Sequence, residues 1–279
     1  MAIDENGILY DPFGGQKDLE ARKLRNVSDA FSEDPLRVLR IARFAAKLHF
    51  QKFTISKNTY RLIQKIILKN ELEALSGERI FQEFIKAFQT QNPETFIQVL
   101  QQLGVFLHIL KPLNKVSKSH LIPVLYAIKK NCCDINILLA ITLSKLSHKK
   151  ELTEVLSELK VTKKTHLLCM NVFCHHNFFS TLQNHCGKDI LQTLKAINAL
   201  RNKSNFKQFI LTLQYINRQN DLALSNLQLT KEIQEKLISH HYLLVIQDIQ
   251  NKKEIADNII KSQLLIIKET CHRIMLKKS

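Results

Sequence analysis

The sequence predicts a mainly α-helical protein with a short β strand and turn at its N-terminus. Only 6 of the 279 residues are glycine and 5 are proline, and tryptophan is absent. An all-β sandwich needs a turn about every 8–12 residues, which so few turn-forming residues do not supply. Apolar residues make up 45% of the chain and charged residues 24%, which is the balance of a folded protein with a hydrophobic core.

The expected β structure lies at the start of the chain. Residues 7–10 (GILY) are predicted to be the end of a strand, and residues 11–15 (DPFGG) form a turn. Residues 18–25 follow as a short charged helix or turn, and residues 24–27 as another short extended piece.

From Asp34 onward, apolar residues recur with a helical period almost throughout the chain. Pro35 suits the first position of a helix that Asp34 caps and that runs to about Leu48. No fixed-period repeat is present, and residues 111–120, with a proline and several basic or histidine residues, best fit a boundary between two helical units. Further helices are expected at about 56–70, 77–89, 93–103, 118–131, 135–147, 150–159, 163–176, 187–201, 204–219, 230–237 and 252–271.

The charge of the chain indicates the class of its partner. There are 41 Lys and Arg against 25 Asp and Glu, a formal net charge of +16. This charge favours a polyanion, most simply a nucleic acid, with an anionic membrane surface as the competing interpretation. No apolar run approaches the ~18 residues of a membrane span, and the acidic first residues do not resemble a signal peptide. The six cysteines form no CxxC pair, so we interpret them as reduced thiols of a cytoplasmic protein.

The helix after Asp34 is amphipathic. Its apolar residues occupy one half of the helical wheel, and its basic residues lie together on the other side. The basic residues are Arg37, Arg40, Arg43 and Lys47. This face is either a solvated surface or an anion-binding surface, in which Arg37 and Arg40, one turn apart, grip the same phosphate or base edge. Periodicity alone does not choose between these interpretations.

Two ordered segments resemble a known family. Residues 11–19 (DPFGGQKDL) and residues 27–46 (VSDAFSEDPLRVLRIARFAA) together resemble the class II tRNA nucleotidyltransferases, the bacterial CCA-adding enzymes that build the 3′ end of tRNA. Residues 77–87 (GERIFQEFIKA) are similar to the neck helix that supports the family's site. Bacterial poly(A) polymerases share the helix after Asp34, but residues 27–31 look more like the CCA-adding enzymes. The matching motif residues are Asp11, Gly14, Gly15, Asp18, Glu33, Asp34, Arg37, Arg40, Glu78 and Arg79.

The resemblance implies a domain organisation with an elongated, all-helical neck and body. Residues 1–33 would be the C-terminal remnant of the nucleotidyltransferase head domain. Residues 34–112 would be the nucleotide-reading neck, and residues 113–279 a helical body and tail that binds tRNA. The similarity is close over about residues 1–110 and thin thereafter.

The resemblance assigns nucleotide reading to Asp34 and Arg37, with Arg40 beside them in contact with the base or nucleotide. Cytosine and adenine both present an amino donor beside a ring-nitrogen acceptor, whereas uracil and guanine present a carbonyl in place of the amino group. A carboxylate accepts from the amino group and a guanidinium donates to the ring nitrogen, so one Asp/Arg pair accepts CTP and ATP and rejects the others. The alternative for Asp34 is a plain helix cap, and the two roles can coexist.

The same resemblance shows what the chain lacks. The family transfers a nucleotide with an Asp-x-Asp pair that binds two metal ions in the head domain, and this sequence contains no such pair after a phosphate-gripping segment. Residues 1–4 look like the tail of a head-domain motif, which makes Met1 resemble an internal methionine. We therefore expect a distal portion that is inactive alone, with Mg²⁺ used only with the missing head. The expected partners are tRNA and a separate head-domain polypeptide; the alternatives are a non-catalytic RNA-binding module or a decayed fragment.

The distal half carries no convincing metal site. By alignment, Ser144 and Lys145 stand where multifunctional members of the family have the His and Asp ligands of a phosphohydrolase. Lysine does not replace a carboxylate on a cation, so no metal is expected there. Adjacent helical residues such as His175 and His176 point about 100° apart, so we interpret them as ordinary histidines rather than as metal ligands.

Overall fold

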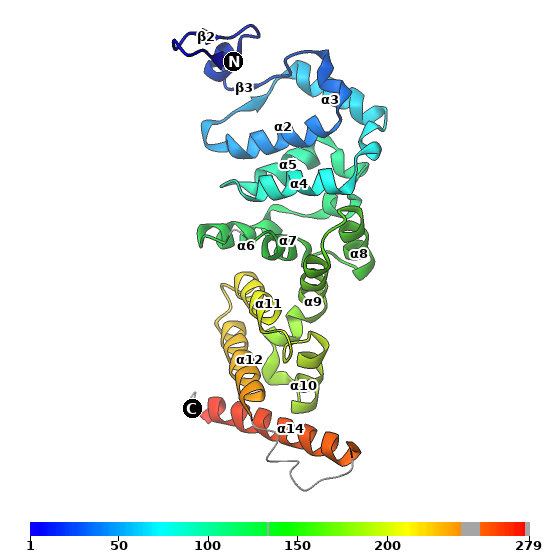
Figure 1. The fold of residues 1–279 in the computed structure, drawn as a ribbon, viewed down its shortest axis with the longest axis vertical. Helices are drawn as coiled ribbons and strands as arrows, with labels where there is room; N and C mark the ends of the chain where they lie inside the picture. The colour runs from blue at the N-terminus through cyan, green and yellow to red at the C-terminus, as the bar shows by residue number, and fades with distance from the viewer. Residues whose placement is uncertain (133, 241–251, 277–279) are drawn as a thin grey trace. The chain divides into compact units, whose positions relative to one another are not determined.

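The computed structural model describes residues 1–132, 134–240 and 252–276, and its architecture confirms the predicted mainly α-helical class (Figure 1). Cys133 lies outside the described residues. The longer helices are α2 (Leu36–Lys47), α3 (Lys57–Leu68), α4 (Gly77–Phe88), α5 (Pro93–Leu103), α6 (Lys118–Lys129), α7 (Ile135–Leu143), α8 (Lys149–Glu158), α9 (Lys163–Ser180), α10 (Gly187–Ala196), α11 (Lys203–Ile216), α12 (Asp221–Ser239) and α14 (Lys252–Leu276).

The strands are short and lie near the N-terminus. The predicted strand end at residues 7–10 is confirmed as β2 (Leu9–Tyr10), which pairs antiparallel with β1 (Ala2–Ile3). The short helix α1 (Gly15–Glu20) follows, and then β3 (Lys23–Leu24). β3 pairs in parallel with β4 (Thr54–Ile55), a strand that the sequence analysis did not predict.

Several helix ends differ from the prediction. α12 begins at Asp221 rather than near residue 230, because the side chain of Asn220 accepts a hydrogen bond from the backbone N–H of Ala223 at 2.9 Å and caps the helix. α7 ends at Leu143 rather than near residue 147. α9 extends to Ser180, and α10 ends at Ala196 just before Asn198, whose φ is +56°.

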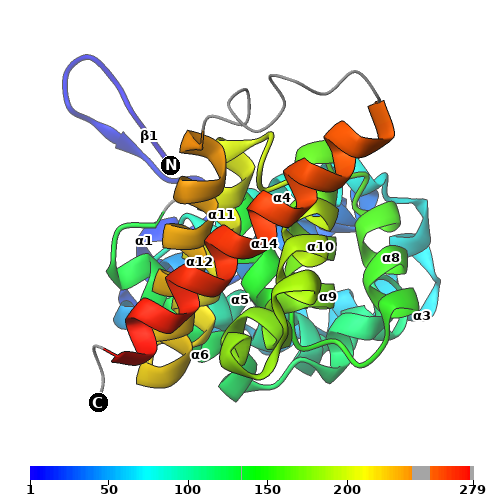
Figure 2. The same cartoon turned by 90° about the horizontal axis from the view of Figure 1, so that it is seen from below.

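The chain divides into two compact units. The first consists of residues 1–138 and 145–166, and the second of residues 139–144 and 167–279. In the first unit, α2 packs against α4 and α5, and the ring of Phe84 meets the ring of Phe96 edge-on with centroids 5.0 Å apart. In the second, α14 packs against α10 and α12, and Figure 2 shows it running across both. Both cores bury large apolar side chains, which is the main stabilising contribution in each unit.

Residues 1–33 contribute no buried side chain to the first unit. Many of their apolar residues are exposed, including Ile3, Tyr10, Phe13, Leu19 and Val27, whereas Leu24 and Phe31 are half-buried. Polar contacts and short strands therefore hold this segment in place. None of the described helices is both long enough and apolar enough to span a membrane.

Candidate nucleotide-binding site

Asp34 stands at the entry to α2. Its side chain accepts a hydrogen bond from the backbone N–H of Leu36 at 3.2 Å, and its carbonyl accepts from the N–H of Arg37 at 3.0 Å. Pro35 follows with helical backbone angles, and its fixed φ suits the first turn. Asp34 therefore satisfies backbone donors at the helix start, which is the capping role considered for it from the sequence.

A second contact holds the same carboxylate. Nη2 of Arg79, from the first turn of α4, lies 3.0 Å from each carboxylate oxygen of Asp34. The pair joins the N-terminal ends of α2 and α4, and both side chains keep partial access to solvent. Sequence analysis selected both residues but did not pair them, because 45 positions separate them in the chain.

Arg37 and Arg40 line one pocket of about 600 Å³. Arg37 is half-buried and donates from Nη1 to the carbonyl of Ala30, whereas Arg40 is exposed. Asp34 does not line this pocket. The structure therefore brings the two arginines to a common cavity, while the carboxylate expected to act with them is engaged by Arg79. The other lining residues are Asp18, Lys23, Leu24, Arg25, Asn26, Val27, Ser28, Ala30, Phe31, Ile41 and Phe44.

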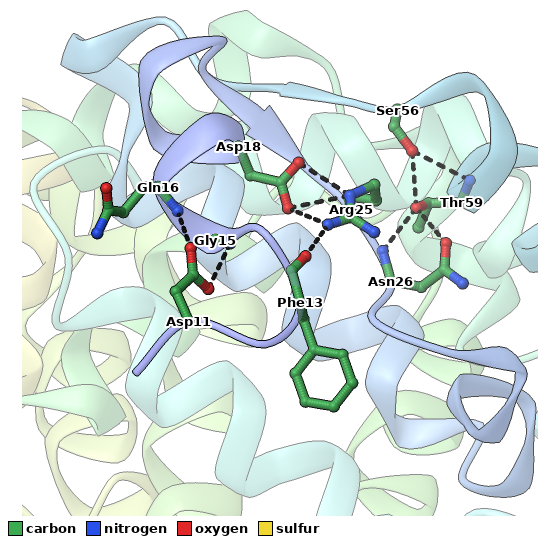
Figure 3. Close-up of polar contacts among 9 residues, drawn as sticks. All are labelled: Asp11, Phe13, Gly15, Gln16, Asp18, Arg25, Asn26, Ser56 and Thr59. Atoms are coloured by element: carbon green, nitrogen blue, oxygen red, sulfur yellow. Dashed lines mark hydrogen bonds and ion pairs between the residues drawn. The ribbon is translucent and has the colours of Figure 1, made fainter. Parts of the chain in front are cut away.

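Hydrogen bonds between the Asp11 side chain and nearby backbone N–H groups hold the loop at Asp11. The Asp11 carboxylate accepts from the backbone N–H groups of Gly15 at 2.7 Å and Gln16 at 2.8 Å, at the start of α1 (Figure 3). These two hydrogen bonds lower the pKa of Asp11. Gly14 has a φ of +70°, a left-handed conformation that glycine adopts without a steric cost.

Arg25 connects this loop to the pocket. Its Nε donates to both carboxylate oxygens of Asp18 at 2.9 and 3.0 Å, and its Nη2 donates to the carbonyl of Phe13 at 2.5 Å (Figure 3). The next residue, Asn26, exchanges hydrogen bonds with the buried Thr59 of α3, at 2.8 and 2.7 Å. Sequence analysis selected Asp18 but missed Arg25, although both residues line the pocket.

The remaining motif residues have separate surroundings. Glu33 is exposed at the end of the 3₁₀ helix η1 (Asp29–Glu33). Glu78 is exposed and pairs with Lys160 at 2.9 Å, and this contact lowers its pKa. A Cβ atom at Gly77 would lie 1.7 Å from the carbonyl oxygen of Glu158, so only glycine permits the approach of α4 to the end of α8. Glu33 and Glu78 therefore do not join the pocket.

The basic face of α2 is not uniform. Arg43 donates from Nε to Glu83 at 2.7 Å, and the side chains are only 16% and 4% exposed. Arg43 is therefore not part of an exposed cationic surface, because α4 supplies a buried carboxylate opposite it. Arg40 and Lys47 are the exposed members of this face.

The residues considered as metal ligands in the sequence analysis lie in the second half of the chain. Across residues 1–132, 134–240 and 252–276, no three His, Cys, Asp or Glu side chains gather as a metal site would require. Ser144 is buried and its hydroxyl donates to the carbonyl of Ile141 at 2.8 Å, while the side chain of Lys145 is exposed. Nδ1 of His176 lies 3.1 Å from the carbonyl oxygen of Val172 on its own helix.

Comparisons with known proteins agree with this architecture. Residues 52–116 match the family described as the probable RNA and SrmB-binding site of polymerase A. The chain is 50% identical over 116 residues to a multifunctional CCA protein of Vibrio cholerae O395, covering 42% of this chain and 29% of the relative. A multifunctional CCA protein of Shewanella denitrificans is 50% identical over 112 residues, covering 40% and 27%. The chain thus spans less than a third of the length of these relatives.

Solved structures extend the similarity of fold. A CCA-adding enzyme in complex with CTP superposes with a TM-score of 0.66 at 20% identity, covering 98% of this chain and 67% of that one. A Thermotoga maritima CCA-adding enzyme complexed with tRNA gives 0.55 at 20% identity, covering 92% and 68%. By sequence over part of its length and by fold over nearly all of it, the chain is similar to CCA-adding enzymes.

Proposed function

We propose that this chain supplies base recognition and tRNA binding for the addition of CCA to tRNA. The observation that carries the proposal is the pocket that Arg37 and Arg40 both line, one helical turn after Asp34 at the start of α2. One relative by fold is a CCA-adding enzyme in complex with CTP, and another is described in complex with ATP. The proposed substrates are therefore CTP and ATP, and the proposed location is the cytoplasm.

In this proposal, Arg37 donates to the ring nitrogen that cytosine and adenine share, and Asp34 accepts from their amino group. A carboxylate offers about four lone-pair positions, so Asp34 can accept from a base amino group while it accepts from Leu36 and Arg79. Arg79 is then a positioning residue that fixes the orientation of the carboxylate. Arg40, exposed at the same pocket, meets the nucleotide.

The proposed RNA partner is tRNA. A relative by fold is described in complex with tRNA, and residues 52–116 match a family described as a probable RNA-binding site. The +16 charge supports the proposal, because neutralising RNA phosphates releases counterions. The binding should therefore weaken steeply with salt.

A separate head-domain polypeptide is the proposed second partner. Residues 1–33 bury none of their side chains and present exposed apolar ones, such as Ile3 and Phe13. A two-stranded hairpin is only marginally stable by itself, and a segment with this many exposed apolar side chains and no buried one gains stability when a partner covers it. The proposed partner covers this surface and carries the carboxylates that bind Mg²⁺.

The test is labelled CTP and ATP incorporation into tRNA that lacks its CCA end. We expect no incorporation with the chain alone, and incorporation when the head domain of a multifunctional CCA protein is added. Incorporation by the chain alone would contradict the proposed division of labour. Binding of tRNA without incorporation in the mixture would favour the second candidate, a non-catalytic RNA-binding module, which the matched RNA-binding family also fits.

A further inference from the structure

A second cavity in the first unit shares no lining residue with the pocket at Arg37 and Arg40. It measures about 600 Å³ and lies between the end of α2, the 3₁₀ helix η2 (His49–Gln51), β4, α3 and α5. From this cavity we infer a binding site for an unpaired nucleobase of RNA. The inference rests on the proposed function only in that the chain binds RNA.

Exposed aromatic side chains line the cavity. Phe50 is 68% exposed and Tyr60 is 44% exposed, and the half-buried Phe53 also lines the space. The ring of Phe50 meets the ring of His49 edge-on, with centroids 5.8 Å apart. Exposed aromatic rings next to an apolar cavity are the platform on which unpaired bases stack, because every base has a π face.

The polar groups of the cavity suit a nucleotide. Gln102 is exposed at the rim, and its amide supplies both a donor and an acceptor for a base edge. Oγ1 of Thr95 lies 3.0 Å from Nδ1 of His49, which fixes the orientation of the imidazole. Lys52 also lines the cavity and is exposed, in position to meet a phosphate.

The charge of the residues that line the cavity favours one class of ligand over another. The residues that line the cavity include Lys52 and His49 but no Asp or Glu, so an anionic ligand meets no repulsion there. An apolar side chain of a protein partner would use the aromatic walls but would need neither the amide of Gln102 nor the charge of Lys52. A nucleotide uses all three features.

The test compares the affinity of the full chain for a labelled single-stranded RNA octamer with its affinity for a blunt duplex of the same length. Phe50→Leu keeps an apolar side chain but removes the π face, so single-strand affinity should fall about tenfold while duplex affinity changes less than about twofold. Tyr60→Phe keeps the ring and should retain single-strand affinity. Leu68→Ala is the matched control, since Leu68 is 79% exposed on α3 and does not line the cavity.

A second readout is the salt dependence of single-strand binding. Lys52→Gln should reduce the slope of log affinity against log salt by about 0.7, the value for one phosphate on a single strand, and Phe50→Leu should leave the slope unchanged. Equal single-strand affinity of Phe50→Leu and the unaltered chain would overturn the inference, and is the result expected if an apolar protein segment occupies the cavity. Failure of the unaltered chain to bind tRNA in the same assay would overturn the proposed function itself, whereas binding of tRNA without binding of the single strand would overturn only the inference.

Discussion

Residues 1–33 and the helices α2 to α5 belong to one unit but are stabilised in different ways. The helices enclose a core in which Leu39, Ile63 and Phe84 are completely buried, whereas the first 33 residues bury no side chain. Local hydrogen bonds hold the first segment, such as those from Gly15 and Gln16 to Asp11. Motif residues are therefore present in both regions, but only the helical region has a hydrophobic core of its own to hold them.

The largest expected effect is on the core of the helical region. Phe84→Ala should lower the free energy of unfolding by about 3–5 kcal/mol, because it removes a fully buried ring and leaves a cavity against Phe96. Phe13→Ala, in the exposed segment, should change it by less than about 0.5 kcal/mol. Chemical denaturation followed by circular dichroism measures both values. Similar losses for the two variants would remove the contrast between the regions.

The next effect concerns the buried ion pair between α2 and α4. Arg43→Ala should lower the free energy of unfolding by about 3 kcal/mol, because it leaves the nearly buried carboxylate of Glu83 without its closest partner. The exposed Lys47 on the same helix provides the control, and Lys47→Ala should have little effect. Adding Glu83→Gln to Arg43→Ala should restore part of the loss. A double variant less stable than Arg43→Ala would argue against an uncompensated charge as the cause.

Substitutions at the nucleotide pocket should have a smaller effect, on the free energy of nucleotide recognition. This effect is measured with a head domain added. Arg37→Ala should impair use of both CTP and ATP, and Asp34→Ala should relax discrimination against UTP and GTP by about tenfold, since a bidentate base contact contributes roughly 1–3 kcal/mol. Arg40→Ala should weaken nucleotide binding with less effect on base choice. Incorporation assays with each nucleotide separate these outcomes.

Lys47→Ala, on the exposed part of the same basic face, is the control for this series. Arg43 does not serve as a control, because its substitution disturbs the ion pair with Glu83. If Lys47→Ala impaired nucleotide use as strongly as Arg37→Ala, the face would act as a general cationic surface.

The smallest effect is the pH dependence of the loop at Asp11. The folded-state pKa of Asp11 lies below its unfolded value, so the stabilisation is fully present above the unfolded pKa of about 3.9 and is lost as pH falls through the folded pKa. Exchange of the Gly15 and Gln16 amides should therefore accelerate, after correction for intrinsic rates, only under acidic conditions. Asp11→Asn should remove that dependence. If the exchange of these amides still accelerated in acid in Asp11→Asn, another titrating group would be the cause.

Local sequence signals predicted most of the helices. The apolar period and Pro35 placed a helix at about residues 34–48, and the structure has α2 at Leu36–Lys47. The early start of α12 was missed because the cap at Asn220 is a single side chain without a strong flanking signal. β4 was missed because two residues pairing with β3, about thirty positions earlier, leave no local pattern.

At the site too, the sequence identified individual residues but not their contacts with distant parts of the chain. Resemblance selected Asp34, Arg37 and Arg79 one by one, but the contact between Asp34 and Arg79 spans 45 positions. The burial of Arg43 depends on Glu83, 40 positions away. A helical wheel describes only one helix, so it could not show which of the four basic residues meets a carboxylate of a neighbour.

Hydrogen–deuterium exchange of the backbone amides, with and without the head domain of a multifunctional CCA protein, tests the central contrast most directly. We predict that amides of residues 1–33 exchange faster than those of α2 to α5 in the chain alone and gain protection when the head domain is added, while those of α2 to α5 are strongly protected in both samples. Strong protection of residues 1–33 in the chain alone, or no added protection with the head domain bound, would contradict the account.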